Sequence, residues 1–371
     1  MKVSLRSGAT AAVVAATALA AAACSSSGGS TSSSPAAVGS AAASSATAGA
    51  ASSSSAPSVA FMIPGSLGDL GFFDSANAGL KKASGLGVSD YKVVESGTND
   101  TSAWLSNLQN LSDTSKYKII VTGSATVADQ LTQVAKQYAD QKFIMFDDAV
   151  DLPNVASITF RQNDGAFLAG ALAALASADK SGFPLSSGND NVGIVGGENI
   201  PVIQDFVVGF QAGAKLVDPK IKVQTSYVGS FTDSQTGYNQ AASMYANGAD
   251  VVFAAAGGSG LGVLKAAHDK GKYAIGVDSD QNGLYPKNIL ASDLKNVGNA
   301  LYDLIRKYEG GSLRFGQTYV FGLQNDGVEL TLNNSLVPAA VSTKLNGYAA
   351  EVTSGKVTVP CVNPYCAAAS S

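Results

Sequence analysis

Histidine is nearly missing from this chain, since His268 is the only one among 371 residues. A single histidine cannot build a multi-histidine metal site, and it leaves histidine-based acid–base catalysis without partners. We assign His268 no role, because the surrounding sequence KAAHDK is typical of a solvated helix end. Three cysteines are too few for a disulfide-dense scaffold or a four-thiolate zinc site. We therefore expect no bound metal and no cofactor.

Charge is also scarce, at 14% of the residues, with 24 basic against 28 acidic side chains. This balance argues against a nucleic-acid-binding protein, which needs a basic face. No apolar run is long enough for an integral membrane transporter. The chain is nevertheless 46% hydrophobic, which at this length suffices for two domains with cores of their own. These limits predict a globular protein of two lobes.

The first 58 residues have the composition of an exported lipoprotein. Lys2 and Arg6 precede an uncharged stretch rich in Ala and Val, which is typical of a secretory signal. The sequence Ala-Ala-Ala-Cys ending at Cys24 resembles a bacterial lipobox, although Ala21 stands where that motif prefers Leu. Ordinary signal-peptidase cleavage is the alternative. Residues 25–58 are uncharged and almost entirely Ser, Ala, Gly, Thr and Pro, which predicts a disordered tether.

We thus predict a signal peptide at 1–23, a lipid on Cys24 and a tether to residue 58. The protein would then be anchored at the outer face of the cell membrane. Its acidic surface gives no reason to expect binding to anionic lipid headgroups, so the anchor alone would hold it there.

The rest of the chain alternates short apolar runs with amphipathic stretches. Such alternation predicts parallel sheets covered by helices on both faces. We place lobe 1 at 59–160 plus 279–325, lobe 2 at 161–278 plus 326–358, and a tail at 359–371. The predicted strands are 59–63, 91–94, 118–121, 143–146, 155–158, 192–195, 222–227, 251–254, 274–277, 289–291 and 318–321. Predicted helices include 126–138, 166–178, 202–216, 237–247, 261–270 and 295–308.

Polar and glycine-rich loops follow several of these strands. In open parallel sheets, ligands bind beyond the carboxyl ends of the strands. Carboxylates, glycines and paired aromatics that converge on one such rim predict a site for a polar small molecule. Each loop also has a simpler explanation, since Gly eases a tight turn and Asp often caps the next segment. The loops are 65–74, 147–148, 196–199, 257–260 and 278–281.

Enzyme motifs are incomplete. The run from Gly257 to Gly262 follows a strand and opens a helix, as a dinucleotide-binding loop does, but Val263 stands where the third glycine of that fingerprint belongs. Neither a GxxxxGK[ST] phosphate loop nor a GxSxG nucleophile elbow occurs. Asp147 and Asp148 are a carboxylate pair, but neighbours on an extended segment point apart. A cofactor-dependent enzyme is the lesser alternative.

Four stretches resemble the basic membrane protein family of substrate-binding lipoproteins, which includes purine nucleoside receptors of ABC transporters. The resemblance runs from about Val59 to Leu330. It implies a type I periplasmic-binding-protein fold, in which two doubly wound α/β lobes close a hinged cleft over a ligand. The stretches are 68–79 (GDLGFFDSANAG), 155–170, 192–213 (with GIVGG, PVI and GFQAG) and 275–281 (IGVDSDQ) with Ser292 and Lys295.

The resemblance implies which residues touch the ligand's flat and sugar parts. Phe72 matches the phenylalanine that stacks on the purine, and Phe231 matches the aromatic residue that covers the opposite face. Gly257 and Gly258 would let the backbone approach the sugar.

The ribose hydroxyls would be held by Asp147, Asp278 and Lys295, which match the carboxylates and the lysine of the family. We expect Lys295 to begin a helix and to neutralise Asp278 when the cleft closes.

The base edge is where the sequence departs from the family. Asp69 would contact this edge of the base. Phe73 replaces the family's Asn there, and its side chain cannot form a hydrogen bond. Asp74 or Asn77 would have to take over that contact, so purine selectivity stays open.

Cys361 and Cys366 lie in the tail, where an oxidising compartment permits a disulfide. Two free thiols in a frayed end are the alternative.

The most specific function predicted is that of a monomeric receptor that delivers nucleosides, purines first, to an ABC permease. A sensory lipoprotein for another sugar-like or aromatic polar solute is the runner-up, since both functions need the same cleft.

Overall fold

The computed structural model describes residues 58–83, 85 and 90–367 of the chain. The predicted signal peptide, Cys24 and all but the last residue of the predicted tether lie outside the described residues. No helix in the described part of the chain combines the length and the apolar character that a membrane span requires.

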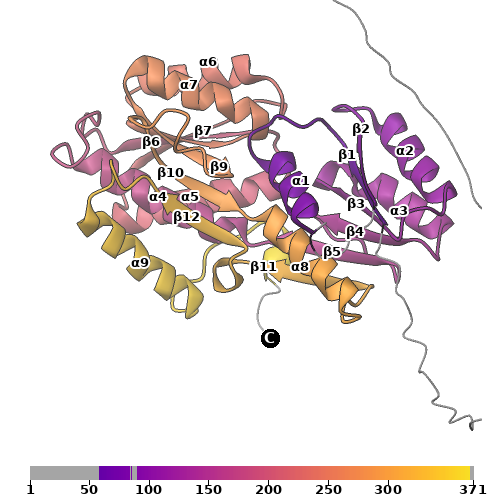
Figure 1. Ribbon diagram of the computed structural model, residues 1–371. Coiled ribbons are helices and arrows are strands. Elements are labelled where there is room, and N and C mark those ends of the chain that lie inside the picture. The colour runs from indigo at the N-terminus through magenta and orange to yellow at the C-terminus, as the bar shows by residue number, and fades with distance from the viewer. Residues whose placement is uncertain (1–57, 84, 86–89, 368–371) are drawn as a thin grey trace, which may run out of the picture. The chain divides into compact units, whose positions relative to one another are not determined.

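Two six-stranded sheets organise the described chain (Figure 1). The strands of the first sheet are all parallel and run in the order β11-β5-β4-β3-β1-β2. The second sheet has the order β12-β10-β9-β8-β6-β7, and only β12 is antiparallel to its neighbour. The two orders correspond strand for strand, so each strand of one sheet has a counterpart in the other. We call each sheet with its helices a lobe.

The first sheet consists of β1 (Ser58–Ile63), β2 (Asp90–Glu95), β3 (Ile119–Gly123), β4 (Lys142–Phe146), β5 (Val155–Phe160) and β11 (Gln317–Phe321). The second consists of β6 (Asn191–Gly196), β7 (Lys222–Tyr227), β8 (Val251–Ala255), β9 (Tyr273–Asp278), β10 (Ile289–Lys295) and β12 (Val328–Leu332).

The helices are α1 (Phe72–Ala83), α2 (Thr101–Asp113), α3 (Ala128–Gln137), α4 (Gln162–Ala178), α5 (Pro201–Val217), α6 (Ser234–Ala246), α7 (Gly260–Lys270), α8 (Val297–Glu309) and α9 (Ala339–Thr353).

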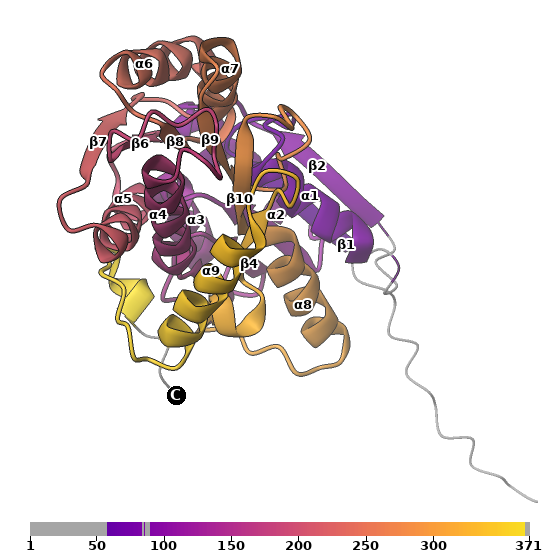
Figure 2. The same ribbon diagram turned by 90° about the vertical axis from the view of Figure 1, so that its left-hand side faces the viewer.

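Helices cover both faces of each sheet, as the buried strands require. In β3, Ile119 and Val121 pack toward α1 and α8, while Ile120 packs toward α2 and α3. The second sheet is covered by α4 and α5 on one face and by α6 and α7 on the other (Figure 2). Alternate residues of a strand face opposite layers, so a strand buried on both sides has a nearly unbroken apolar sequence. This explains why such runs predicted the sheets correctly.

The chain passes between the lobes three times in the described region. It crosses at Arg161, at Asn296 and between β11 and β12. Hydrogen bonds join the first two crossovers to the third. The Arg161 N–H donates to the carbonyl of Phe321 at the end of β11, at 2.8 Å, and the Asn296 N–H donates to the carbonyl of Gly327 just before β12, at 2.9 Å. The connections therefore lie side by side and form the base on which the lobes meet.

Every predicted strand is present, but three details differ from the prediction. β10 pairs with β9, so residues 289–295 belong to the second sheet and not to lobe 1, where the boundary after Asp278 had placed them. Lys295 ends this strand, and α8 begins only at Val297. Strand β12 was missed, because its polar and partly exposed sequence VELTL has no buried apolar run.

Candidate ligand-binding site

A cavity of about 350 Å³ lies between the two lobes, at the carboxyl ends of strands from both sheets. Its volume lies within the usual range of small-molecule sites. Nine residues predicted to bind ligand line it. They are Asp69, Phe72, Phe73, Asp147, Phe231, Gly257, Gly258, Asp278 and Lys295.

Asp74 and Asn77, the other two predicted residues, do not line this cavity. The Asp74 carboxylate accepts hydrogen bonds from the backbone N–H groups of Gly68 and Leu70, both at 3.0 Å. Asn77 is buried and its Oδ1 accepts a hydrogen bond from the Tyr91 hydroxyl at 2.9 Å. Both side chains are used within the first lobe, so neither replaces the family's Asn at the cavity.

Four strands end at the cavity in a left-handed backbone conformation. Ser124 follows β3, Asp147 follows β4, Gly257 follows β8 and Asp278 ends β9, with φ angles of 99°, 70°, 54° and 66°. This region of φ is strained for residues other than Gly, and such strain is concentrated at functional sites. The strained turns at the ends of β4 and β9 place two buried Asp side chains at the cavity.

Lys295 connects the lobes through a buried ion pair with Asp147. Lys295 ends β10 of the second sheet, whereas Asp147 follows β4 of the first. The ammonium also lies 5.4, 5.3 and 5.6 Å from the ring centroids of Phe72, Phe160 and Phe206. The ion-pair partner of Lys295 is thus the carboxylate across the cleft, whereas on Asp278, which we expected it to neutralise, its charge acts without an ion pair.

Among the buried carboxylates that line the cavity in the described chain, Asp278 is the one without such a partner. Within the described part of the chain, no hydrogen bond or ion pair reaches its carboxylate, although the charge of Lys295 acts on it from a distance. Burial raises the pKa of Asp278 to about 7, and the negative charges of Asp69 and Asp147 add to the rise. A buried acceptor of this kind is suited to a hydroxyl donor brought by a ligand.

Aromatic rings approach the cavity from both lobes. Phe72 and Phe73 begin α1, with ring centroids 5.0 Å apart in an edge-to-face arrangement. Phe231 comes from the second lobe, and its ring lies so close to Gly197 that an added Cβ there would be 2.3 Å from Cε1. Gly197 therefore makes room for this ring. The cavity is bounded by π-surfaces from both lobes.

Asp69 lines the cavity but also holds the start of α1. Its carboxylate accepts hydrogen bonds from the N–H groups of Phe73 at 2.8 Å and of Gly71 and Asp74 at 3.1 Å. Free N–H groups at a helix start need such acceptors. Burial raises the pKa of Asp69, against the effect of these hydrogen bonds. This role was not predicted, although an Asp just before an amphipathic run is its usual signal.

Several lining residues were missed or read differently. Trp104 was not among the predicted site residues; its ring is buried and also lines the cavity, with Nε1 donating to the Gly97 carbonyl at 2.8 Å. Phe206 lies on α5, where its spacing suits a core residue and gives no separate signal. Glu198 lies in one of the predicted loops, and burial raises its pKa.

The charged lining is strongly one-sided. It contains Asp69, Asp147, Glu198 and Asp278, while Lys295, already paired, is the only cation among the described lining residues. Carboxylates accept hydrogen bonds well from hydroxyl groups and repel anions. This site can hold a neutral ligand that has a flat ring and several hydroxyl donors.

The comparisons agree with this architecture. Residues 56–362 match the family model described as ABC transporter substrate-binding protein PnrA-like. The chain is 36% identical over 289 residues to basic membrane protein D of Borreliella burgdorferi, covering 76% of this chain and 80% of that one. It is 33% identical over 300 residues to the ABC transporter nucleoside-binding protein BmpA of Lactococcus lactis, with 76% and 80% covered.

Among solved structures, the fold is similar to that of an ABC transporter solute-binding protein of Aeropyrum pernix, with a TM-score of 0.74 and 24% identity over 82% of this chain and 94% of that one. The family match and the two lobes around a cavity give one conclusion. The chain belongs to the PnrA-like family of ABC transporter substrate-binding proteins, and it has the two-lobed α/β fold of periplasmic solute-binding proteins.

Proposed function

We propose that this protein binds nucleosides, purine nucleosides first, and delivers them to an ABC permease. The observation that carries the proposal is that Phe72 and Phe231 approach one cavity from opposite lobes, beside the carboxylates of Asp147 and Asp278. A nucleobase offers a flat π-face to the rings, and ribose offers vicinal hydroxyls to the carboxylates. The nucleoside-binding relative from Lactococcus lactis supports the same ligand class.

The charges favour the nucleoside over its phosphorylated form. A phosphate in the cavity would meet Asp69, Glu198 and Asp278, while the single lysine is already paired with Asp147. Binding phosphate usually takes unpaired Arg or Lys side chains or a helix N-terminus. A nucleotide should therefore bind more weakly than the matching nucleoside.

Mass spectrometry of the ligand released from purified, denatured protein tests the ligand class directly. A nucleoside that is recovered unchanged supports binding without turnover. A bound sugar, amino acid or nicotinamide cofactor in its place would reject the proposal.

Calorimetry with Phe72→Ala tests the stacking. Stacking on an aromatic side chain contributes about 1–3 kcal/mol per base in single-stranded nucleic-acid sites. Guanosine should lose roughly that amount of binding free energy, whereas any binding of free ribose should be unchanged. Phe315→Ala is a matched control, because this ring packs on Tyr308 of α8 and does not line the cavity. Equal losses in both variants would place the ligand elsewhere.

We further propose that Cys24 carries the lipid that holds the protein at the outer face of the membrane. The support is the lipobox-like sequence before Cys24 and the uncharged stretch after it. Cys24→Ser should move the protein from the membrane fraction to the medium or the periplasm. An unchanged membrane fraction in that variant would contradict the anchor.

A further inference from the structure

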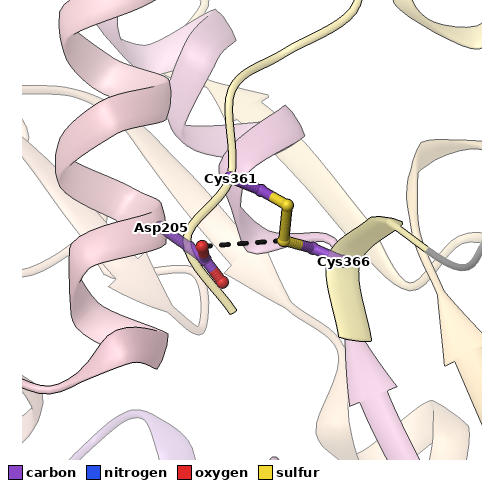
Figure 3. Close-up of side chains that lie close together, drawn as sticks. All are labelled: Asp205, Cys361 and Cys366. Carbon is purple, nitrogen blue, oxygen red and sulfur yellow. Dashed lines mark hydrogen bonds between the residues drawn. A yellow bond between two sulfur atoms is a disulfide. The ribbon is translucent and has the colours of Figure 1, made fainter. Parts of the chain in front are cut away.

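The C-terminal segment forms a small closed loop that the ligand-binding site does not use. A disulfide joins Cys361 to Cys366, which confirms the bridge that the sequence permitted. Figure 3 shows this disulfide beside the carboxylate of Asp205, which lies on α5. We refer to residues 361–366 as the disulfide loop. The loop's two sulfurs are bonded to each other, so their place beside Asp205 does not make a metal site.

Asp205 is the buried anchor of the disulfide loop. Its Oδ1 accepts hydrogen bonds from the N–H groups of Val362 at 2.6 Å and Asn363 at 3.0 Å, and it lies 3.6 Å from Cys366 Sγ (Figure 3). Its Oδ2 accepts a hydrogen bond from Gln162 Nε2 at 2.7 Å. A buried carboxylate is tolerated only with such donors.

The same loop is bonded to the first crossover between the lobes. Arg161 Nη1 donates to the Cys366 carbonyl at 2.6 Å, and Asn163 Nδ2 donates to the carbonyls of Val359 and Pro360 at 3.2 Å. The short helix of residues Pro364–Ala367 also packs against β5 of the first sheet. The segment thus contacts the first lobe, the crossover and, through Asp205, the second lobe.

The anchor points of the loop lie directly behind the ligand-binding site. Phe206 follows Asp205 on α5 and lines the cavity, and Phe160 ends β5 just before the crossover. Both rings pack around the Lys295 ammonium. Burial raises the pKa of Asp205, and the charge of Lys295 is among the smaller effects that oppose this rise. A shift of the loop would therefore reach the cavity along two short paths. One runs from Asp205 to Phe206, and the other runs from Arg161 through Phe160 to Lys295.

We propose that the disulfide loop is a redox-sensitive brace of the hinge, which holds the first crossover and thereby sets ligand affinity. A dithiol reduces the bond with two electrons and two protons: two thiols form on Cys361 and Cys366, and the dithiol closes to a cyclic disulfide. The freed segment gains conformational entropy, and its hydrogen bonds to Asp205, Arg161 and Asn163 weaken. Asp205 is then a buried carboxylate with too few donors.

Hydrogen exchange in the ligand-free chain tests the brace without reference to any ligand. Every sample carries Cys24→Ser, so that all thiols come from the loop. Reduction with dithiothreitol should speed amide exchange in peptides covering residues 157–170 at least tenfold, while peptides from α2 stay unchanged. The variant Cys361→Ser/Cys366→Ser should exchange at the fast rate with or without dithiothreitol. Equal exchange at 157–170 in oxidised and reduced protein overturns the proposal.

Two Asp205 variants separate the anchor's hydrogen bonds from its charge. Asp205→Ala removes every acceptor and should exchange like the reduced protein. Asp205→Asn keeps an oxygen for Val362 and Asn363, and Gln162 can turn its unbonded Oε1 toward the new amide. Asp205→Asn should therefore exchange at a rate close to that of the oxidised parent. The same fast rate in both variants would contradict an anchor that acts through accepted hydrogen bonds.

The effect on affinity rests on the proposed nucleoside function and is measured with guanosine by calorimetry. Reduction should weaken binding threefold or more, and the double-serine variant should match the reduced protein. Affinities that agree within twofold would overturn the coupling between brace and site. If guanosine does not bind the oxidised protein at all, guanosine is not a ligand of the cavity, and the exchange measurement still decides the brace.

Discussion

Asp147 and Asp278 occupy corresponding places in the two lobes. Their strands, β4 and β9, hold the same position in the order of their sheets. Both residues follow or end the strand in a left-handed conformation, both are 8% exposed, and both line the cavity. They differ in one respect: Asp147 is paired with Lys295, and Asp278 has no such partner in the described chain.

Equivalent backbone positions in the two lobes therefore have different roles. The pair of Asp147 with Lys295 joins the lobes at the base of the cleft. Asp278 keeps its oxygen atoms for a group that the protein does not supply. Asp278 has a strained backbone, with φ at 66°, and no salt bridge of its own offsets this strain. This combination is expected of a residue that is retained for binding.

The largest effect should come from breaking the ion pair with Lys295→Met. Asp147 and Asp278 would then both be buried beside the cavity without any cation. Removing one partner of a buried pair costs about 3–5 kcal/mol of the free energy of unfolding. Urea denaturation at pH 7 measures this. Lys307→Met is the control, since its partner Asp303 is only half-buried and keeps a second cation, Arg306, and a loss below about 1 kcal/mol is expected there. Equal small losses would show that the interlobe pair is not structural.

Replacing each of the two carboxylates by an amide should change the free energy of unfolding in opposite directions. Asp147→Asn leaves Lys295 buried without its counter-charge and should lower the free energy of unfolding by about 3 kcal/mol. Asp278→Asn removes a carboxylate whose ionised form is destabilised by burial at high pH, and Asn tolerates the left-handed backbone. It should raise ligand-free stability by about 1–3 kcal/mol at pH 8. The same sign in both variants would remove the distinction between the two sites.

A titration should sharpen the contrast further. Because burial raises the pKa of Asp278 to about 7, its contribution to ligand-free stability is fully present below the unfolded value of 3.8 and is lost as pH rises through 7. Ligand hydroxyls need the ionised form, so affinity should move the other way. Guanosine should bind about tenfold more weakly at pH 6 than at pH 8. Asp278→Asn should flatten both profiles, and a pH-independent affinity in the parent protein would contradict the assignment.

The strands were predictable because each is a buried apolar run, and parallel strands end at a common edge where the loops converge. The sequence pattern therefore sufficed to place the loops of Phe72 and Asp278 at one rim, whereas Phe231 was assigned to the site only by the family resemblance. It did not suffice for the partner of Lys295, because Asp147 lies in the other lobe and no local pattern records a pairing across the cleft. The polar end of β10 also resembles a helix start, which is why the strand was predicted to end at Ala291.

The contacts of Asp205 could not be predicted from the sequence either. Asp205 lies in an apolar helix and its donors, Val362 and Asn363, are more than 150 residues away. Only the folded chain brings the tail back to the crossover. The predicted export to an oxidising compartment permitted the Cys361–Cys366 bridge, but the sequence did not indicate what the bridge holds.

The most direct test of the account compares guanosine with 2′-deoxyguanosine by calorimetry, in the parent protein and in Asp278→Asn, at pH 8. A hydrogen bond from a ribose hydroxyl to an ionised carboxylate contributes about 1.5–3 kcal/mol. The parent protein should therefore prefer guanosine by roughly that amount, and Asp278→Asn should lose most of the preference while still binding the deoxynucleoside. An equal preference in both proteins, or none in the parent, would contradict a cavity in which Asp278 receives the sugar.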